Sequence, residues 1–190
     1  MRIILASKSP RRKELLRKIV PEFEIITRET DETLHEGIHP RDGVEILAVR
    51  KGRAVADELS DDVMIVSSDT LVELGGVSLG KPVDEENAVN ILLSLSGKTH
   101  NVHTGVAVHF KGKVFSGVDT SSVSFREFGE KEAREYVSTG EPMDKAGAYA
   151  IQGIGAKFVE KYEGEFDTIV GLGLKLTKKL IEQAEKYDEE

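Results

Sequence analysis

Near its N-terminus the sequence reads Leu5-Ala6-Ser7-Lys8-Ser9-Pro10-Arg11-Arg12-Lys13. The residues from Arg2 to Ala6 are mostly apolar, which is typical of a short buried strand. Ser9 is a favoured residue just before a helix, and proline is favoured at the first helical position. The stretch therefore predicts a strand, a turn and a helix that runs from Pro10 to about Lys18.

Helical and strand-like patterns are mixed along the rest of the chain. We expect further helices at 41–59, 84–95, 129–138 and 174–187, and strands at 23–27, 63–68, 101–110, 114–125, 157–162 and 167–170. A hairpin over 71–79 should turn at Gly75-Gly76. This mixture predicts an α/β protein with a mixed twisted sheet and flanking helices, in a single domain over 1–190.

The composition excludes several classes of protein. The 190 residues include no cysteine, which excludes disulfides, thiolate catalysis and cysteine-based metal sites. The formal net charge of -8 argues against general nucleic-acid binding, because that needs a basic face. No apolar run reaches membrane-spanning length and no signal-peptide pattern is seen, so we expect a cytoplasmic protein without a membrane partner.

Basic and hydroxyl side chains surround the predicted start of the first helix. Free backbone N–H groups and the helix dipole favour an anion at such a position. Ser7 and Ser9 add hydroxyl donors, while Arg11 and Arg12 add guanidinium groups that match phosphate oxygens. The pattern indicates a triphosphate-binding turn that lacks the glycines of a P-loop. An ordinary capped surface helix with solvated basic residues is the alternative.

Carboxylates and lysines elsewhere are candidates for the chemistry. Asp69 and Thr70 directly follow the predicted strand 63–68, and a carboxylate at a strand end can hold Mg²⁺ or orient a water. Glu32, in a separate acidic loop, could supply a second carboxylate. On pattern alone, Asp69 could equally begin a turn. Lys51 and Lys81, each taken by itself, would be read as solvated side chains.

Three other patterns are discounted. Ser96-Gly97-Lys98-Thr99 resembles the end of a P-loop, but Leu92 stands where the motif requires glycine. His100 and His103 should point to opposite faces of a strand, which disfavours a zinc site. A serine hydrolase that uses Ser7 or Ser9 lacks a recognisable histidine partner.

Six segments, taken together and in order, resemble the Maf family of nucleotide pyrophosphatases, also described as septum-formation-inhibitor-like. They span nearly the whole chain: Ala6–Arg12, the helix segment around Lys51, Ser68–Thr70, Gly80–Pro82, Leu95–His100 and Asp144–Gly153. The pattern departs from the family's at two places. Ser67-Ser68 stands where a small pair ending in alanine is usual, and Gly171-Leu172-Gly173-Leu174 stands where Gly-Leu-Pro-Leu is usual.

The resemblance implies a fold, a reaction and site residues. The fold has two lobes around a cleft and is related to that of the inosine triphosphate pyrophosphatases. The reaction is hydrolysis of a nucleoside triphosphate to the monophosphate and pyrophosphate with a divalent cation, Mg²⁺ or Mn²⁺, in a cytoplasmic protein that is often a homodimer. Asp69 matches the catalytic acidic residue, as base or as metal ligand. Arg11, Thr70 and Gln152 match specificity positions, and Glu32, Lys51 and Lys81 match other cleft residues.

The run Ala148–Gly153, which contains Gln152, resembles the Maf subgroup that acts on dTTP and UTP, and modified pyrimidine nucleotides are further candidates. The 7-methyl-GTP subgroup has glutamate at this position. A glutamine amide both donates and accepts, which suits the adjacent carbonyl and N–H of uracil and thymine, whereas an ionised glutamate only accepts. The rival interpretation is a non-catalytic nucleotide-binding regulator of cell division, which would bind nucleotide without releasing pyrophosphate.

Overall fold

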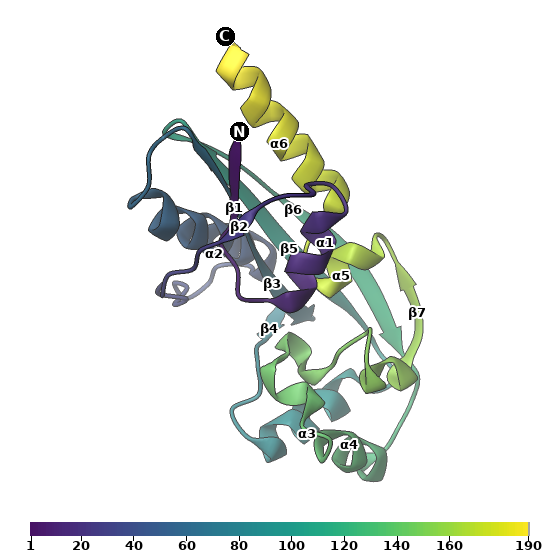
Figure 1. Ribbon diagram of the computed structural model, residues 1–190. Coiled ribbons are helices and arrows are strands. Elements are labelled where there is room, and N and C mark those ends of the chain that lie inside the picture. Colours follow the sequence, from purple (N-terminus) through teal and green to yellow (C-terminus); the bar gives the residue numbers. More distant parts are fainter. Residues whose placement is uncertain (190) are drawn as a thin grey trace.

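One mixed sheet runs through the molecule in the computed structural model, which describes residues 1–189 (Figure 1). The strands lie in the order β2-β1-β3-β5-β6-β7, and β4 pairs with β3. Their bounds are β1 Arg2–Leu5, β2 Glu24–Ile25, β3 Val63–Leu74, β4 Val77–Leu79, β5 Thr99–Phe110, β6 Lys113–Phe125 and β7 Val159–Glu163. Strands β1, β2 and β3 are parallel, and the other pairings are antiparallel, so the predicted mixed α/β sheet is confirmed.

Six α-helices and three 3₁₀ turns accompany the sheet in residues 1–189. The helices are α1 Pro10–Arg17, α2 Pro40–Ala56, α3 Glu85–Leu95, α4 Glu130–Val137, α5 Phe166–Val170 and α6 Leu174–Glu189. The 3₁₀ turns span Glu141–Asp144, Ala146–Ala148 and Ile154–Phe158. Every helix in this part of the chain is too short or too polar to cross a lipid bilayer.

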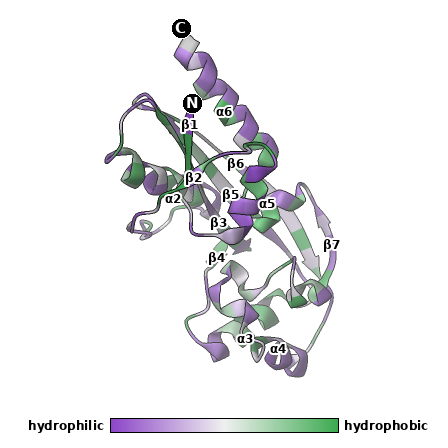
Figure 2. Cartoon of the chain, in the orientation of Figure 1, coloured by the Kyte–Doolittle hydropathy of each residue, from purple (hydrophilic) through white to green (hydrophobic). Residues whose placement is uncertain are grey.

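The first lobe forms where helices cover both faces of β1, β3 and β5. On one face, Ile4 and Ile65 pack with Val55 of α2. On the other, Val66 packs with Leu16 of α1 and Leu180 of α6, in a cluster that contains Leu5, Met64 and Val108 as well. Figure 2 shows hydrophobic and hydrophilic residues sharing the length of α6, as an amphipathic helix requires. Adjacent strand residues point to opposite faces, so a continuous apolar run is buried on both sides.

The second lobe contains α3, α4 and the 3₁₀ turns, at the far ends of β3, β5 and β6 (Figure 1). Its core is aromatic: Phe125, Tyr136 and Phe158 are almost fully buried and pack with Leu92 of α3. The Asp84 carboxylate accepts a hydrogen bond from the backbone N–H of Asn87 at 2.7 Å, which confirms the predicted start of α3. The two lobes expected from the family resemblance are thus present.

The structure corrects several predicted elements. Strand 63–68 does not end before Asp69: β3 continues to Leu74, so Asp69 and Thr70 lie in mid-strand and not at a strand tip. The predicted strand 23–27 is reduced to two residues. Residues 167–170 form helix α5 and not a strand, because the Asp167 carboxylate accepts the N–H groups of Thr168 and Leu174 and holds a compact turn there.

Candidate active site

A gap in the pairing of β3 opens the sheet beside Asp69. On one side of β3, Leu5 of β1 pairs with Val66, and pairing with β4 begins only at Val72. Within residues 1–189, positions 67–71 have no strand neighbour on this side. Side chains from both faces of β3 can reach this edge, so Asp69 and Thr70 line the same cavity although they alternate in direction.

The cavity has a volume of about 730 Å³ and lies between the two lobes. Its walls come from the turn before α1, the loop before α2, the middle of β3, the Lys81 loop and the segment between the second and third 3₁₀ turns. All the site residues predicted from the sequence line it: Ser7, Ser9, Arg11, Arg12, Glu32, Lys51, Asp69, Thr70, Lys81 and Gln152. Residues separated by more than 140 positions in the sequence therefore meet in one place.

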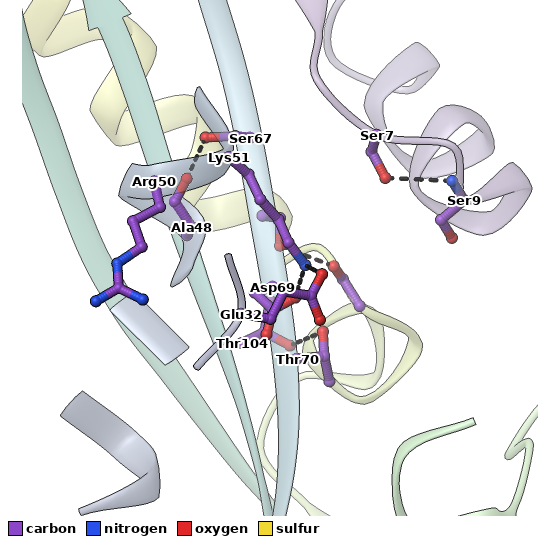
Figure 3. A network of polar contacts seen from close by, with 12 residues as sticks. Ser7, Ser9, Glu32, Ala48, Arg50, Lys51, Ser67, Asp69, Thr70 and Thr104 are labelled. Atoms are coloured by element: carbon purple, nitrogen blue, oxygen red, sulfur yellow. Dashed lines mark hydrogen bonds and ion pairs between the residues drawn. The ribbon is translucent and has the colours of Figure 1, made fainter. Parts of the chain in front are cut away.

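The Lys51 ammonium lies between two carboxylates (Figure 3). It contacts Asp69 Oδ1 and lies 2.8 Å from Glu32 Oε1. Helix α2 places Lys51 over β3. Gly52 allows this helix to lie close to the sheet, because a Cβ at Gly52 would overlap the ring of His109 on β5. The hydrogen bond from Lys51 holds the pKa of Glu32 below its ordinary value. Both carboxylates therefore face one point in the cavity.

Arg50 holds the loop that carries Glu32. Its Nη1 atom donates to the carbonyl oxygens of Thr33 at 2.7 Å and Asp31 at 3.3 Å. The Asp31 carboxylate in turn accepts the Thr33 backbone N–H at 2.8 Å. These contacts flank Glu32 on both sides, so neighbouring residues of α2 anchor the loop (Arg50) and contact its carboxylate (Lys51).

The start of α1 has the geometry expected of an anion site. Ser9 caps the helix by accepting the Arg12 N–H at 3.4 Å, and Ser7 Oγ accepts the Ser9 N–H at 3.2 Å. The Arg12 guanidinium is already partly engaged, because Nε donates to the Gly171 carbonyl at 2.8 Å and Nη2 donates to Thr70 Oγ1 at 3.1 Å. Burial lowers the pKa of Arg12, and the charge of Asp69 opposes that shift.

Glu141 organises the loop that carries Gln152. Its Oε1 accepts the N–H of Ile154 at 3.0 Å, and Oε2 accepts the N–H of Gly155 at 3.0 Å and the Tyr136 hydroxyl at 2.7 Å. The Tyr136 oxygen also accepts the Ala150 N–H at 3.1 Å. The loop thus wraps around one carboxylate, which places Gln152 at the cavity.

The apolar end of the cavity adjoins this loop. It is lined by Val72, Val102, Tyr149, Ile151 and Ile169. The Tyr149 hydroxyl lies 2.8 Å from Nε2 of the buried His100, which fixes the ring. An apolar surface beside a cation-rich one suits a ligand that joins a flat base to several phosphates.

Comparison with known proteins decides the family. A family model described as Maf-like protein matches residues 2–184. The chain belongs to the Maf family. It is 44% identical to a dTTP/UTP pyrophosphatase of Aquifex aeolicus (strain VF5), over 96% of this chain and 95% of that protein. It is 46% identical to a dTTP/UTP pyrophosphatase of Pelotomaculum thermopropionicum, over 90% of this chain and 91% of that protein.

Among solved structures, the chain is similar to a nucleoside-triphosphatase (dITP/XTP pyrophosphatase) from Mycobacterium abscessus. The sequence identity is 14% and the TM-score is 0.45, over 100% of this chain and 98% of that one.

The two departures from the usual Maf pattern lie against each other. Ser68 Oγ donates to the Gly171 carbonyl at 3.0 Å, the same oxygen that Arg12 Nε contacts. At Gly173 a Cβ would overlap the Asp119 carboxylate, so this backbone packs more closely than a proline would allow without a shift.

Several cavity residues were not singled out from the sequence. Lys145 and Asp144 line the cavity and contact each other. They are the first two residues of the segment Asp144–Gly153 that matches the Maf pattern. Lys8 and Arg28 also line it. The segment match could have drawn attention to Asp144 and Lys145, whereas nothing in the sequence marks Arg28, which belongs to an irregular loop.

The donor set fits a small hard cation. The Asp69 and Glu32 carboxylates converge on the Lys51 ammonium, so both can face a single positive charge. Mg²⁺ is commonly held by one or two carboxylates together with substrate phosphate oxygens and water. Within residues 1–189, no three histidine or acidic side chains are grouped as a self-sufficient metal site. A cation here would therefore share its ligands with the substrate.

Proposed function

We propose that this chain hydrolyses nucleoside triphosphates, dTTP and UTP in particular, to the monophosphate and pyrophosphate. The observation that carries the proposal is the meeting of Asp69 with the basic residues Arg11, Arg12, Lys51 and Lys81 in one cavity. Membership of the Maf family and the names of its relatives from Aquifex aeolicus and Pelotomaculum thermopropionicum support it. Both lobes line the cavity, which supports a single functional domain over 1–190.

In the proposed mechanism, the basic residues that line the cavity neutralise the negative charge of the triphosphate. Arg11, Arg12 and Lys81 bind the triphosphate, and the α1 N-terminus with Ser7 and Ser9 offers further donors. Asp69 orients or deprotonates a water that attacks the α-phosphorus. The bond from that phosphorus to the bridging oxygen breaks, and pyrophosphate leaves with its charge balanced by the same basic residues.

Asp69 and Glu32 would hold a divalent cation, Mg²⁺ or Mn²⁺. When bound, such a cation neutralises charge on the phosphate oxygens and polarises the reacting phosphoryl group. Lys51 adds a fixed positive charge beside both carboxylates. It keeps them close together before substrate arrives, so less reorganisation is needed on binding.

The base is proposed to lie at the apolar end, against Gln152. The amide can donate to a carbonyl and accept from an N–H, as the edge of uracil or thymine requires. The family's cytoplasmic location and its frequent homodimer are carried over as expectations, and gel filtration measures the latter.

A substrate panel tests the proposal. The protein is assayed for pyrophosphate release from dTTP, UTP, CTP and GTP, with Mg²⁺ or Mn²⁺ and with a chelator. We expect release from dTTP and UTP with either cation and none with the chelator. Tight nucleotide binding without pyrophosphate, across all four nucleotides and both cations, would contradict the proposal and leave the non-catalytic regulator.

A further inference from the structure

A chain of three threonines lies beneath the cavity. Thr70 of β3 and Thr104 of β5 are directly opposite in the sheet, and their Oγ1 atoms are 3.0 Å apart (Figure 3). Thr104 is fully buried, and its Oγ1 donates to the backbone carbonyl of Thr168 at 2.7 Å. Thr70 lines the cavity, whereas Thr104 is not among the residues that do.

The direction of each hydrogen bond follows from proton counting. A threonine hydroxyl has one proton and two lone pairs. A carbonyl oxygen can only accept, so the proton of Thr104 is committed to Thr168. In the bond between the two hydroxyls, Thr70 must therefore donate and Thr104 must accept. Since Arg12 Nη2 also donates to Thr70 Oγ1, one lone pair of Thr70 remains free.

We infer that Thr104 is a positioning residue that makes Thr70 an acceptor only, so that the cavity selects a ligand with an N–H at this point. The inference rests on the proposed function and deepens it. Thr70 and Val72 share one face of β3, and Val72 belongs to the apolar end of the cavity, where the base is proposed to lie. Uracil and thymine carry a proton on N3, whereas N3 of cytosine is a bare acceptor.

The hydrogen bond from Thr70 to Thr104 supplies the discrimination between uracil and cytosine that Gln152 lacks. A glutamine amide can rotate by half a turn and exchange its donor and acceptor, so by itself it serves cytosine as well as uracil. Thr70 cannot exchange donor and acceptor in this way, because its hydroxyl proton is donated to Thr104. A cytosine N3 would face the free lone pair of Thr70, and two acceptors repel.

Thr104→Val tests the inference, because it keeps the shape of the side chain and removes the hydroxyl. The Thr70 proton is then free to turn toward the ligand. Affinities are measured by calorimetry for UTP and CTP analogues with an imide bridge between the α- and β-phosphates, which resist cleavage. We expect the preference for the UTP analogue over the CTP analogue to fall at least about fivefold, the scale of one hydrogen bond. Thr104→Ser should keep the parental preference.

Ser121→Ala is the matched control. Ser121 is buried on the adjacent strand β6, and its Oγ donates to the Glu165 carbonyl at 2.9 Å, just before α5. Its loss removes a similar hydroxyl-to-carbonyl bond without touching Thr70, so we expect the parental preference. If Thr104→Val does not fold, Thr70→Val gives the second test, because removal of the acceptor should lower the same preference.

The outcomes separate the inference from the proposed function. An unchanged preference in folded Thr104→Val overturns the inference, even if both affinities fall together. A parent that binds the two analogues equally also overturns it. Analogue binding with the expected preference supports it, and a failure of the same protein to release pyrophosphate from UTP would then count against the proposed catalysis alone.

Discussion

At the scale of single residues, Lys51 explains how two carboxylates can stand close together in a partly buried site. Their mutual repulsion is offset by an ammonium that contacts both. The same arrangement makes Asp69 the most sensitive position in the proposed mechanism, since its side chain contacts Lys51 and lines the cavity together with Arg11 and Arg12. Asp69 is only 8% exposed, so it is held in place by packing as well as by charge.

Asp69→Asn should therefore abolish turnover while the fold persists. The amide keeps the shape but cannot take a proton or neutralise a cation, so we expect kcat for UTP to fall by at least about 10². The melting temperature is measured alongside, to verify that the protein remains folded.

Asp119→Asn is the control for this prediction. Asp119 is a half-buried carboxyl on β6 outside the cavity, and burial raises its pKa. We expect its variant to keep turnover within about threefold of the parent, as for a site remote from the chemistry. Parental activity in Asp69→Asn would refute the assignment.

At the scale of elements, the loop that carries Gln152 depends on Glu141. Its carboxylate accepts two backbone N–H groups, and in Glu141→Gln the amide group must turn its own N–H₂ toward one of these donors. We expect hydrogen–deuterium exchange at Ile154 and Gly155 to accelerate and kcat/KM for UTP to fall about tenfold. The control is Glu130→Gln, which loses only an exposed ion pair with Arg134 and should leave both readouts unchanged.

The elements also show what sequence patterns could and could not predict. Ser9, Pro10 and Asp84 act locally, so α1 and α3 were placed within a residue or two. The end of β3 could not be placed in this way, because pairing with β5 continues through the polar residues Asp69 and Thr70. Asp69 pairs with Gly105, and a partner 36 residues away leaves no mark in the local sequence pattern. Residues 167–170 differ for another reason: their β-branched residues are typical of a strand, but the Asp167 carboxylate holds a helical turn there.

The candidate site shows the same division between local and distant information. The ten residues predicted from the helix-start pattern and the family resemblance all line one cavity, but no periodicity could place Glu32 beside Lys51. Thr104 carried no signal at all: it is one polar residue in a strand, and its role depends on register with Thr70 and on a carbonyl in α5.

At the scale of the whole molecule, two buried histidines tie the stability of both lobes to pH. His109 lies under α2 in the first lobe, and His100 contacts Phe125 and Tyr149 in the second. Within residues 1–189, both ring nitrogens of His109 and Nδ1 of His100 have no hydrogen-bond partner. Burial lowers the pKa of each ring to about 4, so both are neutral in the folded protein near neutral pH.

Stability should therefore fall as the pH drops from about 6.5 toward 4. In this window the unfolded chain binds protons at these histidines with an ordinary pKa near 6.5, while the folded rings stay neutral, so protons favour unfolding. Melting temperatures at pH 7.5 and pH 5 measure the effect. His109→Leu should lose less stability between the two pH values than the parent, because one unfavourable protonation of a buried histidine is gone. His35→Leu, at an exposed position, should retain the parental difference. An equal pH dependence in His109→Leu and the parent would show that burial of the His109 ring does not contribute to the loss of stability at acidic pH.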